Sequence, residues 1–284
     1  MTKQRTFNFT RFYDLTNSLV TENDLAWLIG FAEGDGSFII RQNNQLIFKV
    51  IQSSEDIQVL KYIQNMLGFG QIKQNTKTTH CDVVSHMHKV EILISLFNGI
   101  IVTPKFYQRF HKFVSAYNSK LINPKAKHYY NKLSHIVIDT RLIIPSLNDA
   151  WLSGFTDAEG CFHGAFRGIK YQNFRYEYSV GQKGTENKEV IENIRKLWKV
   201  GEVYYYKRDD HWTFRCRNLK EITLIIPYFQ RFPLQSKKKI SFYKWVTFLN
   251  ALINKDHLNR TKKIKLIEFV KTINKTKKKS RIVI

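Results

Sequence analysis

Cysteine, long apolar runs and acidic residues are scarce in this sequence of 284 residues, and each shortage excludes a class of protein. The three cysteines, Cys81, Cys161 and Cys216, lie far apart without a CxxC spacing, so neither a zinc site nor a disulfide framework is expected. No apolar run approaches the roughly 20 residues that a membrane span requires. The polar, basic start lacks the apolar region of a secretory signal. We therefore expect a globular protein of a reducing compartment, without a membrane partner.

The shortage of acidic residues leaves a large positive charge. Lysine and arginine total 46 against 23 acidic residues, which gives a net charge of +23 spread along the chain. Such a field attracts polyanions, nucleic acid first and an anionic membrane surface second. A lysine-rich soluble surface is the alternative, but it normally interleaves glutamate and stays nearer neutrality. The frequent Ile, Asn, Lys, Tyr and Phe are typical of an AT-rich gene and favour an organelle genome, so we expect a mitochondrial location.

One odd stretch occurs twice. DLAWLIGFAEGDGSF at 24–38 and NDAWLSGFTDAEGCF at 148–162 carry the same Ala, Trp, Leu, Gly and Phe at matching places. Three later pairs of segments keep the same order and spacing, 48–52 with 178–182, 67–72 with 198–203, and 103–113 with 236–245. Self-similarity at this scale predicts two copies of a domain of roughly 120 residues. We expect an N-terminal repeat over 1–120 with an extension over 1–20, a linker over 121–145, and a C-terminal repeat over 146–284.

Within each copy the patterns predict one order of elements. A helix opens behind an S/T-x-x-D cap signal, at Thr21 or Ser146, and ends at Gly36 or Gly160. A strand pair with polar alternates, a helix with apolar residues at helical spacing, a second hairpin and further apolar helices follow. The fold class is therefore α+β, with two pseudo-symmetric α-β-β-α-β-β-α repeats that each contain an antiparallel sheet.

The opening helix of each repeat is almost wholly apolar, so it should be buried. Gly30 and Gly34 lie four residues apart, as do Gly154 and Ala158, which places small residues on one helix face and allows two backbones to approach closely. We therefore expect the two helices to pack on each other along a pseudo-twofold axis.

This packing would bring four acidic residues together at the helix ends, namely Glu33, Asp35, Asp157 and Glu159. Helix C-termini carry partial negative charge and unpaired carbonyls, so clustered acids there require a cation. Carboxylate and carbonyl oxygens with open positions for water and phosphate suit Mg²⁺.

FAEGDG and FTDAEG, each preceded by a helical WLxG, resemble the two motifs of a LAGLIDADG homing endonuclease in its single-chain form. The resemblance covers essentially the whole chain after about residue 20. It implies that the last acid of each motif binds the catalytic metal, with the preceding carbonyl facing the ions, which gives the ligands Asp35, Glu159, Gly34 and Ala158. Roughly two or three Mg²⁺ ions would be shared between the repeats, and Mn²⁺ or Ca²⁺ could substitute for binding. Glu33 and Asp157 are then structural or helix-end residues.

The resemblance also implies further catalytic side chains. The family has a basic residue near the start of a late helix in each half, and matching FHKF with FYKW aligns Lys105 with Lys237. The KKK run leaves Lys238 as a rival to Lys237. Gln52 and Gln182, at the ends of the second strands, would lie beside the scissile phosphate. Solvated surface positions are the alternative for every one of these residues.

The sheets should supply DNA recognition, since alternation sends one set of side chains to the core and the other to an exposed face. Polar side chains at alternate positions read base edges in a major groove, which accepts β-ribbons. The expected DNA-facing residues are Ser37, Ile39, Arg41, Asn43, Lys49, Gln71, Lys73 and Asn75 in the first repeat, and Cys161, His163, Arg167, Arg175, Glu177, Ser179, Glu202, Tyr204, Tyr206 and Arg208 in the second. Together the two sheets would form a saddle over a duplex.

The function implied by the resemblance is site-specific cleavage of double-stranded DNA. A monomer would recognise a long asymmetric target and hydrolyse both strands with divalent metal, leaving short 3′ overhangs. Two alternatives remain, an RNA maturase that assists splicing of a group I intron and a DNA-binding regulator, because one fold can serve several functions. Intact acids in both motifs favour cleavage.

Overall fold

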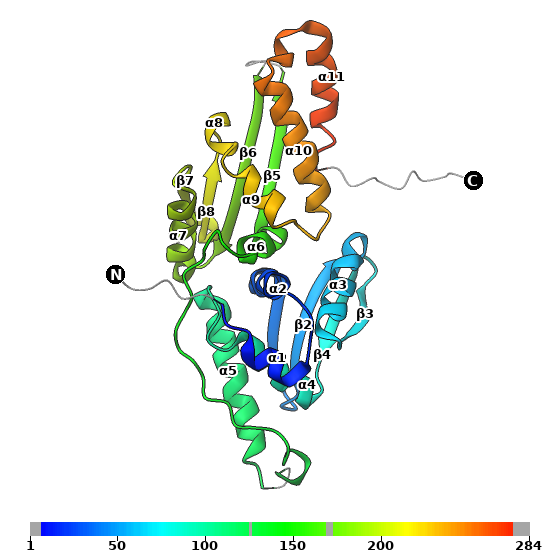
Figure 1. Ribbon diagram of the computed structural model, residues 1–284, viewed down its shortest axis with the longest axis vertical. Coiled ribbons are helices and arrows are strands. Elements are labelled where there is room, and N and C mark those ends of the chain that lie inside the picture. The colour runs from blue at the N-terminus through cyan, green and yellow to red at the C-terminus, as the bar shows by residue number, and fades with distance from the viewer. Residues whose placement is uncertain (1–6, 125–126, 169–172, 275–284) are drawn as a thin grey trace, which may run out of the picture.

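The structure is a computed structural model that describes residues 7–124, 127–168 and 173–274. It consists of two halves, drawn one above the other in Figure 1, each with its own sheet and helices. Helix α2 (Glu22–Asp35) of the first half meets helix α6 (Trp151–Glu159) of the second where the halves join (Figure 1). We call α2 and α6 the motif helices. The α+β architecture of two pseudo-symmetric repeats is confirmed.

Each half contains a four-stranded antiparallel sheet, and the two sheets have the same topology. The first has the order β1-β2-β4-β3 and the second the order β5-β6-β8-β7. The first sheet consists of β1 (Gly36–Ile40), β2 (Leu46–Ser53), β3 (Gln71–Thr76) and β4 (Thr79–Val84). The second consists of β5 (Gly160–Arg167), β6 (Asn173–Lys183), β7 (Glu202–Tyr206) and β8 (His211–Cys216).

Most of the remaining helices contact the sheet of their own half. In the first half they are α1 (Thr10–Thr16), α3 (Ile57–Leu67), α4 (Met87–Phe97) and α5 (Pro104–Leu121). In the second half they are α7 (Lys188–Trp198), α8 (Leu219–Ile222), α9 (Ile226–Arg231), α10 (Lys238–Ile253) and α11 (Arg260–Val270). None of the helices in the described residues is long and apolar enough to cross a membrane.

Aromatic residues bind each sheet to its late helix. Phe38 of β1 lies 4.9 Å from Phe113 of α5, and Phe162 of β5 lies 5.1 Å from Trp245 of α10, between ring centroids. All four side chains are buried. Because alternate residues of a strand point to opposite faces, this packing leaves the other face of each sheet free of helices in the part of the chain that the structure describes.

The motif helices touch through their glycines. A Cβ atom on Gly30 would collide with the backbone carbonyl of Trp151, and one on Gly154 would collide with that of Trp27. Only a residue without a Cβ permits this approach. The predicted packing of the two motif helices through small residues is confirmed.

The helix ends agree with the cap signals at three of four places. Thr21 and Asp24 form a capping box at the start of α2, and Gly36 and Gly160 follow the last residues of α2 and α6. The predicted cap at Ser146 is wrong, because α6 begins five residues later, at Trp151. Asp149 instead accepts the backbone N–H of Trp151 at 2.9 Å and the Ser146 hydroxyl, so this polar segment forms its own turn before the helix.

The segment between the repeats lies along the first repeat. Asn118 of α5 bonds to the backbone of Ile136 through both atoms of its amide, at 2.8 and 3.0 Å. Further along, Ile143 donates its N–H to the carbonyl of Ile101 at 2.9 Å. Figure 1 shows this stretch running beside α5 before it enters the second half. The connection therefore follows a fixed path over the N-terminal repeat.

Candidate active site between the motif helices

The acids that end the two motifs meet where α2 and α6 end. Asp35 is the last residue of α2 and Glu159 the last of α6. A Cβ on Gly34 would lie 3.0 Å from Cγ and 3.4 Å from Oε1 of Glu159. The close helix contact thus places a carboxylate of one repeat against the motif of the other.

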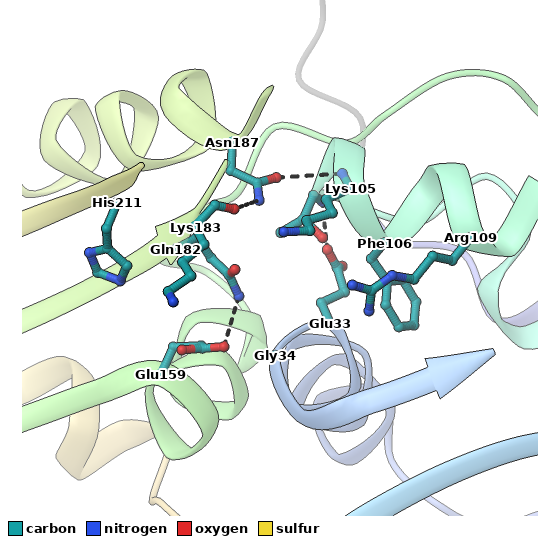
Figure 2. A pocket seen from close by; sticks show the side chains of 11 residues that line it. Glu33, Gly34, Lys105, Phe106, Arg109, Glu159, Gln182, Lys183, Asn187 and His211 are labelled. Atoms are coloured by element: carbon teal, nitrogen blue, oxygen red, sulfur yellow. Dashed lines mark hydrogen bonds between the residues drawn. The ribbon is translucent and has the colours of Figure 1, made fainter. Parts of the chain in front are cut away.

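Each motif acid is held by a glutamine from the sheet of its own repeat. Nε2 of Gln52 donates to Oδ2 of Asp35 at 2.6 Å, and Nε2 of Gln182 donates to Oε1 of Glu159 at 2.9 Å. Figure 2 shows the second pair. Since each amide occupies one carboxylate oxygen, the other oxygen of each acid stays available to a ligand.

Burial raises the pKa of both acids. For Asp35 the amide of Gln52 and the positive charge of Lys238 oppose this rise. For Glu159, burial is followed by the negative charge of Asp35, which raises the pKa further. The charge of Asp35 therefore disfavours the ionised form of Glu159, and a cation between the two carboxylates would stabilise both.

Lys238 supplies one cation at this place. Its ammonium donates to the carbonyl oxygens of Ala158 at 2.8 Å and Thr156 at 3.2 Å, at the end of α6. Burial lowers the pKa of this amine, while the nearby carboxylates of Asp157, Asp35 and Glu159 oppose that shift. Lys238 thus offsets part of the negative charge of the helix end.

The first acid of each motif caps the turn that leads into a late helix. Glu33 accepts the backbone N–H groups of Val102 at 3.0 Å and Thr103 at 2.5 Å, just before α5. Asp157 accepts the N–H of Ser236 at 3.2 Å, just before α10, and also its hydroxyl. Both acids are buried. They fix the starts of the helices that carry the candidate lysines.

These caps give the register of the lysines. Thr103 and Ser236 occupy equivalent places, so Lys105, two residues after Thr103, matches Lys238 rather than Lys237. Lys237 turns toward the first repeat, and its ammonium lies 3.4 Å from Oγ of Ser53. The structure therefore brings Lys238 to the motif acids, and places Lys237 beside the end of β2.

Lys105 lies on the opposite side of the site. It lines a cleft of about 280 Å³ between the repeats, where Figure 2 shows it across from Glu159 and Gln182. Its backbone N–H donates to Oδ1 of Asn187 at 3.5 Å. The remaining lining residues are Glu33, Gly34, Thr103, Phe106, Arg109, Lys183 and His211.

Most of the expected DNA-facing residues lie on one face of each sheet. Directly paired residues share a face, and the pairs Ser37 with Lys49, Cys161 with Ser179, and His163 with Glu177 lie opposite the aromatic core. Ile39, Gln71, Lys73, Arg167, Arg175, Glu202, Tyr204 and Tyr206 follow the same alternation.

Three expected positions depart from the strands. Strand β1 ends at Ile40, because a turn closed by the bond of 3.0 Å from the N–H of Arg41 to the carbonyl of Gln45 follows it. Arg41 and Asn43 therefore lie in that turn. Arg208 lies in a 3₁₀ turn after β7. The assignment of these three residues to regular strand alternation was wrong, whereas Asn75 lies in β3 and its Oδ1 accepts the ammonium of Lys49 at 2.7 Å.

Two arginines of this face escaped the sequence prediction. Arg215 on β8 pairs directly with Ser179, and Arg217 follows β8 and donates to Oε2 of Glu177 at 2.5 Å. The period-two alternation, continued along the fourth strand of the repeat, would have indicated both.

Two α+β repeats that join through helices ending in paired acids define a protein of the LAGLIDADG type. A model of the LAGLIDADG endonuclease family matches residues 28–117 and 152–249. The chain belongs to the LAGLIDADG endonuclease family.

Curated relatives include "Probable intron-encoded endonuclease 4" of Neurospora crassa, which is 33% identical over 88% of this chain and 44% of its own length. An "Uncharacterized cox1 intron-2 37.2 kDa protein" of Schizosaccharomyces pombe is 26% identical over 77% of this chain and 63% of its own length. The chain thus spans less than two thirds of these relatives.

Solved structures share the fold. LAGLIDADG meganuclease I-AabMI bound to uncleaved DNA has a TM-score of 0.73 at 18% identity, over 88% of this chain and 99% of that one. I-SmaMI bound to an uncleaved DNA target in the presence of calcium ions has a TM-score of 0.72 at 18% identity, over 90% and 100%.

Proposed function

We propose that this protein is a site-specific endonuclease that hydrolyses both strands of a long, asymmetric DNA target. The observation that carries the proposal is the meeting of Asp35 and Glu159, one from each repeat, at the contact between the motif helices. A duplex presents two scissile phosphates, and a pseudo-twofold site offers one acid to each. The product would carry short 3′ overhangs.

The donor set fits Mg²⁺. The described residues contain no group of three or more His, Cys, Asp and Glu side chains that could hold a metal. The carboxylates of Asp35 and Glu159 and the carbonyl of Gly34 are nevertheless all oxygen donors, which hard cations prefer. The carbonyl of Ala158 would join them once the Lys238 ammonium, which it accepts at 2.8 Å, moves off it. These four residues would hold about two or three ions, and a related structure was obtained with calcium. Bound Mg²⁺ would supply Lewis-acid stabilisation of phosphoryl charge and a more acidic water.

The other side chains of the site act on charge and position. Gln52 and Gln182 hold the two acids in place through their amides. Lys238 and Lys105 enter from opposite repeats and would offset phosphate charge. None of them is positioned as a nucleophile, so attack by water is the consistent reaction.

The helix-free faces of the sheets would bind the duplex. Polar side chains on alternate strand positions would contact bases, and the net charge of +23 would favour the phosphates. Both repeats lie in one chain, so a monomer suffices. The names of the relatives, which are intron-encoded, support an origin in an organelle intron and a mitochondrial location.

The second candidate function is that of an RNA maturase. It is suggested by the intron-encoded relatives, because a protein encoded in an intron can have the intron RNA as its partner. Retention of both motif acids and of their glutamine partners favours cleavage, since a protein that only binds RNA does not need a metal site.

Selection of cleaved sites from a randomised duplex library, with Mg²⁺ and with EDTA, tests the proposal. We expect Mg²⁺-dependent cleavage that Asp35→Asn and Glu159→Gln abolish without loss of DNA binding. Unchanged cleavage by both variants would overturn the site assignment. Tight binding of intron RNA without cleavage of any duplex would support the maturase.

A further inference from the structure

The DNA-facing surfaces of the two sheets can be compared position by position. The pair Gly36 with Val50 in the first repeat and the pair Gly160 with Val180 in the second both follow directly on the motif acids. Counting outward from these pairs gives structurally matched positions at equal distance from the active site.

At matched positions the two surfaces differ in chemistry. The cross-strand pair Ile39 with Ile47 corresponds to the pair His163 with Glu177. On the next strand, Val83, which pairs with Lys49, corresponds to Arg215, which pairs with Ser179. Three apolar residues in the first repeat therefore stand where the second repeat has the polar set His163, Glu177 and Arg215.

The arginines of the second repeat are held in place. Arg217 donates to Glu177 at 2.5 Å, and Nε of Arg215 lies 3.7 Å from the same carboxylate. The guanidinium of Arg217 lies 5.1 Å from the ring centroid of Tyr204, and that of Arg215 lies 5.0 Å from that of Tyr206. A guanidinium fixed in this way loses less conformational freedom on binding, and its fork matches O6 and N7 of guanine.

The arginine cluster borders an open hollow on the sheet. Arg175, Arg215 and Arg217 line a cleft of about 520 Å³ together with His163 and Glu177. The matched part of the first repeat offers Ile39 and Val83, which can contact thymine methyl groups but cannot form hydrogen bonds with base edges.

The first hairpin of the second repeat also reaches further. The pairing of β5 with β6 has eight register pairs, up to Arg167 with Asn173, whereas that of β1 with β2 has five, up to Ile40 with Leu46. Three more pairs extend a hairpin by about 10 Å. The same length corresponds to about three base pairs of duplex.

The longer hairpin is supported on its core side. A Cβ on Gly164 of β5 would lie 2.5 Å from Cδ1 of Ile273 and 2.8 Å from Cγ2 of Val270. Phe174 of β6 packs on Phe248 of α10, with ring centroids 5.6 Å apart. Helices α10 and α11 thus hold this part of the sheet in a fixed shape.

We propose that base discrimination is concentrated in the arm of the target that the C-terminal sheet binds, where Arg215 and Arg217 read guanine, and that this arm is the longer one. At positions equally far from the centre of the target, the arm under the N-terminal sheet tolerates base changes better than the other arm does. There it favours A·T pairs. This inference rests on the proposed function, since it concerns the duplex bound by the same protein.

Binding selection tests it. The full chain is mixed with a randomised duplex pool in Ca²⁺, bound duplexes are sequenced, and the selected duplex is footprinted. We expect one arm to carry a guanine whose replacement weakens binding about tenfold or more, and to be protected about three base pairs further from the centre. Arg217→Lys, which keeps the charge but loses the fork, should flatten this preference while affinity for the unselected pool stays within about threefold. Val83→Ala, at the position matched to Arg215, should leave the guanine preference and the length of the protected arm unchanged.

If the two arms showed equal base preference in the selected sequences and equal protection in the footprint, the inference would be overturned and the endonuclease proposal would stay intact. A guanine preference that survives in both Arg217→Lys and Arg215→Lys would also overturn it. Absence of any enriched sequence would overturn the endonuclease proposal together with the inference.

Discussion

The indole N–H of Trp27 donates to Oδ2 of Asp157 at 2.9 Å, across the boundary between the two repeats. The reciprocal bond joins the indole of Trp151 to Oε1 of Glu33 at 3.0 Å. Each of these acids also caps the turn before the late helix of its own repeat. The contact between repeats and the placement of the lysine-bearing helices therefore depend on the same two buried carboxylates.

Trp27→Phe should destabilise the protein by about 1–3 kcal/mol, because it leaves a buried carboxylate oxygen with one donor fewer while most of the ring packing is kept. Trp151→Phe should cost a similar amount. Urea unfolding measures both, and Trp245→Phe, whose indole bonds to the carbonyl of His163, serves as a control within one repeat. Unchanged stability in both motif-helix variants would show that these bonds contribute nothing.

Glu33 should make stability fall as pH rises. Burial raises the pKa of Glu33 to about 7, against an ordinary value of 4.5. The folded state then holds a proton that the unfolded state has lost, so the contribution is present below pH 4.5 and disappears as pH passes 7. The change amounts to roughly 3 kcal/mol over this interval.

Urea unfolding of the wild type and Glu33→Gln at several pH values from 4 to 8 checks this, since the variant lacks the titrating group. The difference in unfolding free energy between them should change in favour of the variant as pH rises. Glu189→Gln, at an exposed position of α7, should show no such trend. A constant difference for Glu33→Gln would contradict the assigned pKa.

Much of this site follows from repetition in the sequence. The two motifs are similar over fifteen residues, so helices, glycines and motif acids could be matched without a structure. Gln52 and Gln182 were predicted from their strand ends, although their bonds to the acids depend on tertiary packing.

The lysine register could not be settled in this way. Phe113 of α5 and Trp245 of α10 occupy equivalent places in the two cores. An alignment of the two helices through these aromatic residues matches Lys105 with Lys237. An alignment through the residues that Glu33 and Asp157 bind is shifted by one residue and matches Lys105 with Lys238, which lies at the site. The spacing of aromatic residues within the late helix reflects only its packing in the core. The position of Lys238 depends on the bond between Ser236 and Asp157, which lies about eighty residues earlier in the chain.

Gly30→Ala should lower stability by about 1–3 kcal/mol, because the added methyl group collides with the carbonyl of Trp151 and the two helices must separate. Gly154→Ala should act alike through Trp27. Thermal unfolding measures the effect. Gly168→Ala is a control at an exposed turn, where the nearest atom belongs to the side chain of Phe166. Equal melting temperatures for Gly30→Ala and Gly168→Ala would contradict the close helix contact.

Lys238→Met should slow cleavage about a hundredfold or more, a loss typical of removing one preorganised charged donor from an active site. Lys237→Met should slow it by less than about tenfold, because that ammonium lies beside Ser53 and the acids of the turn after β2, partly exposed to solvent. Single-turnover cleavage of a selected duplex measures the chemical step, and a binding assay in Ca²⁺ separates it from affinity. If Lys237→Met slowed cleavage more than Lys238→Met, Lys237 would be the active lysine, and the alignment through the core aromatic residues would be the correct one.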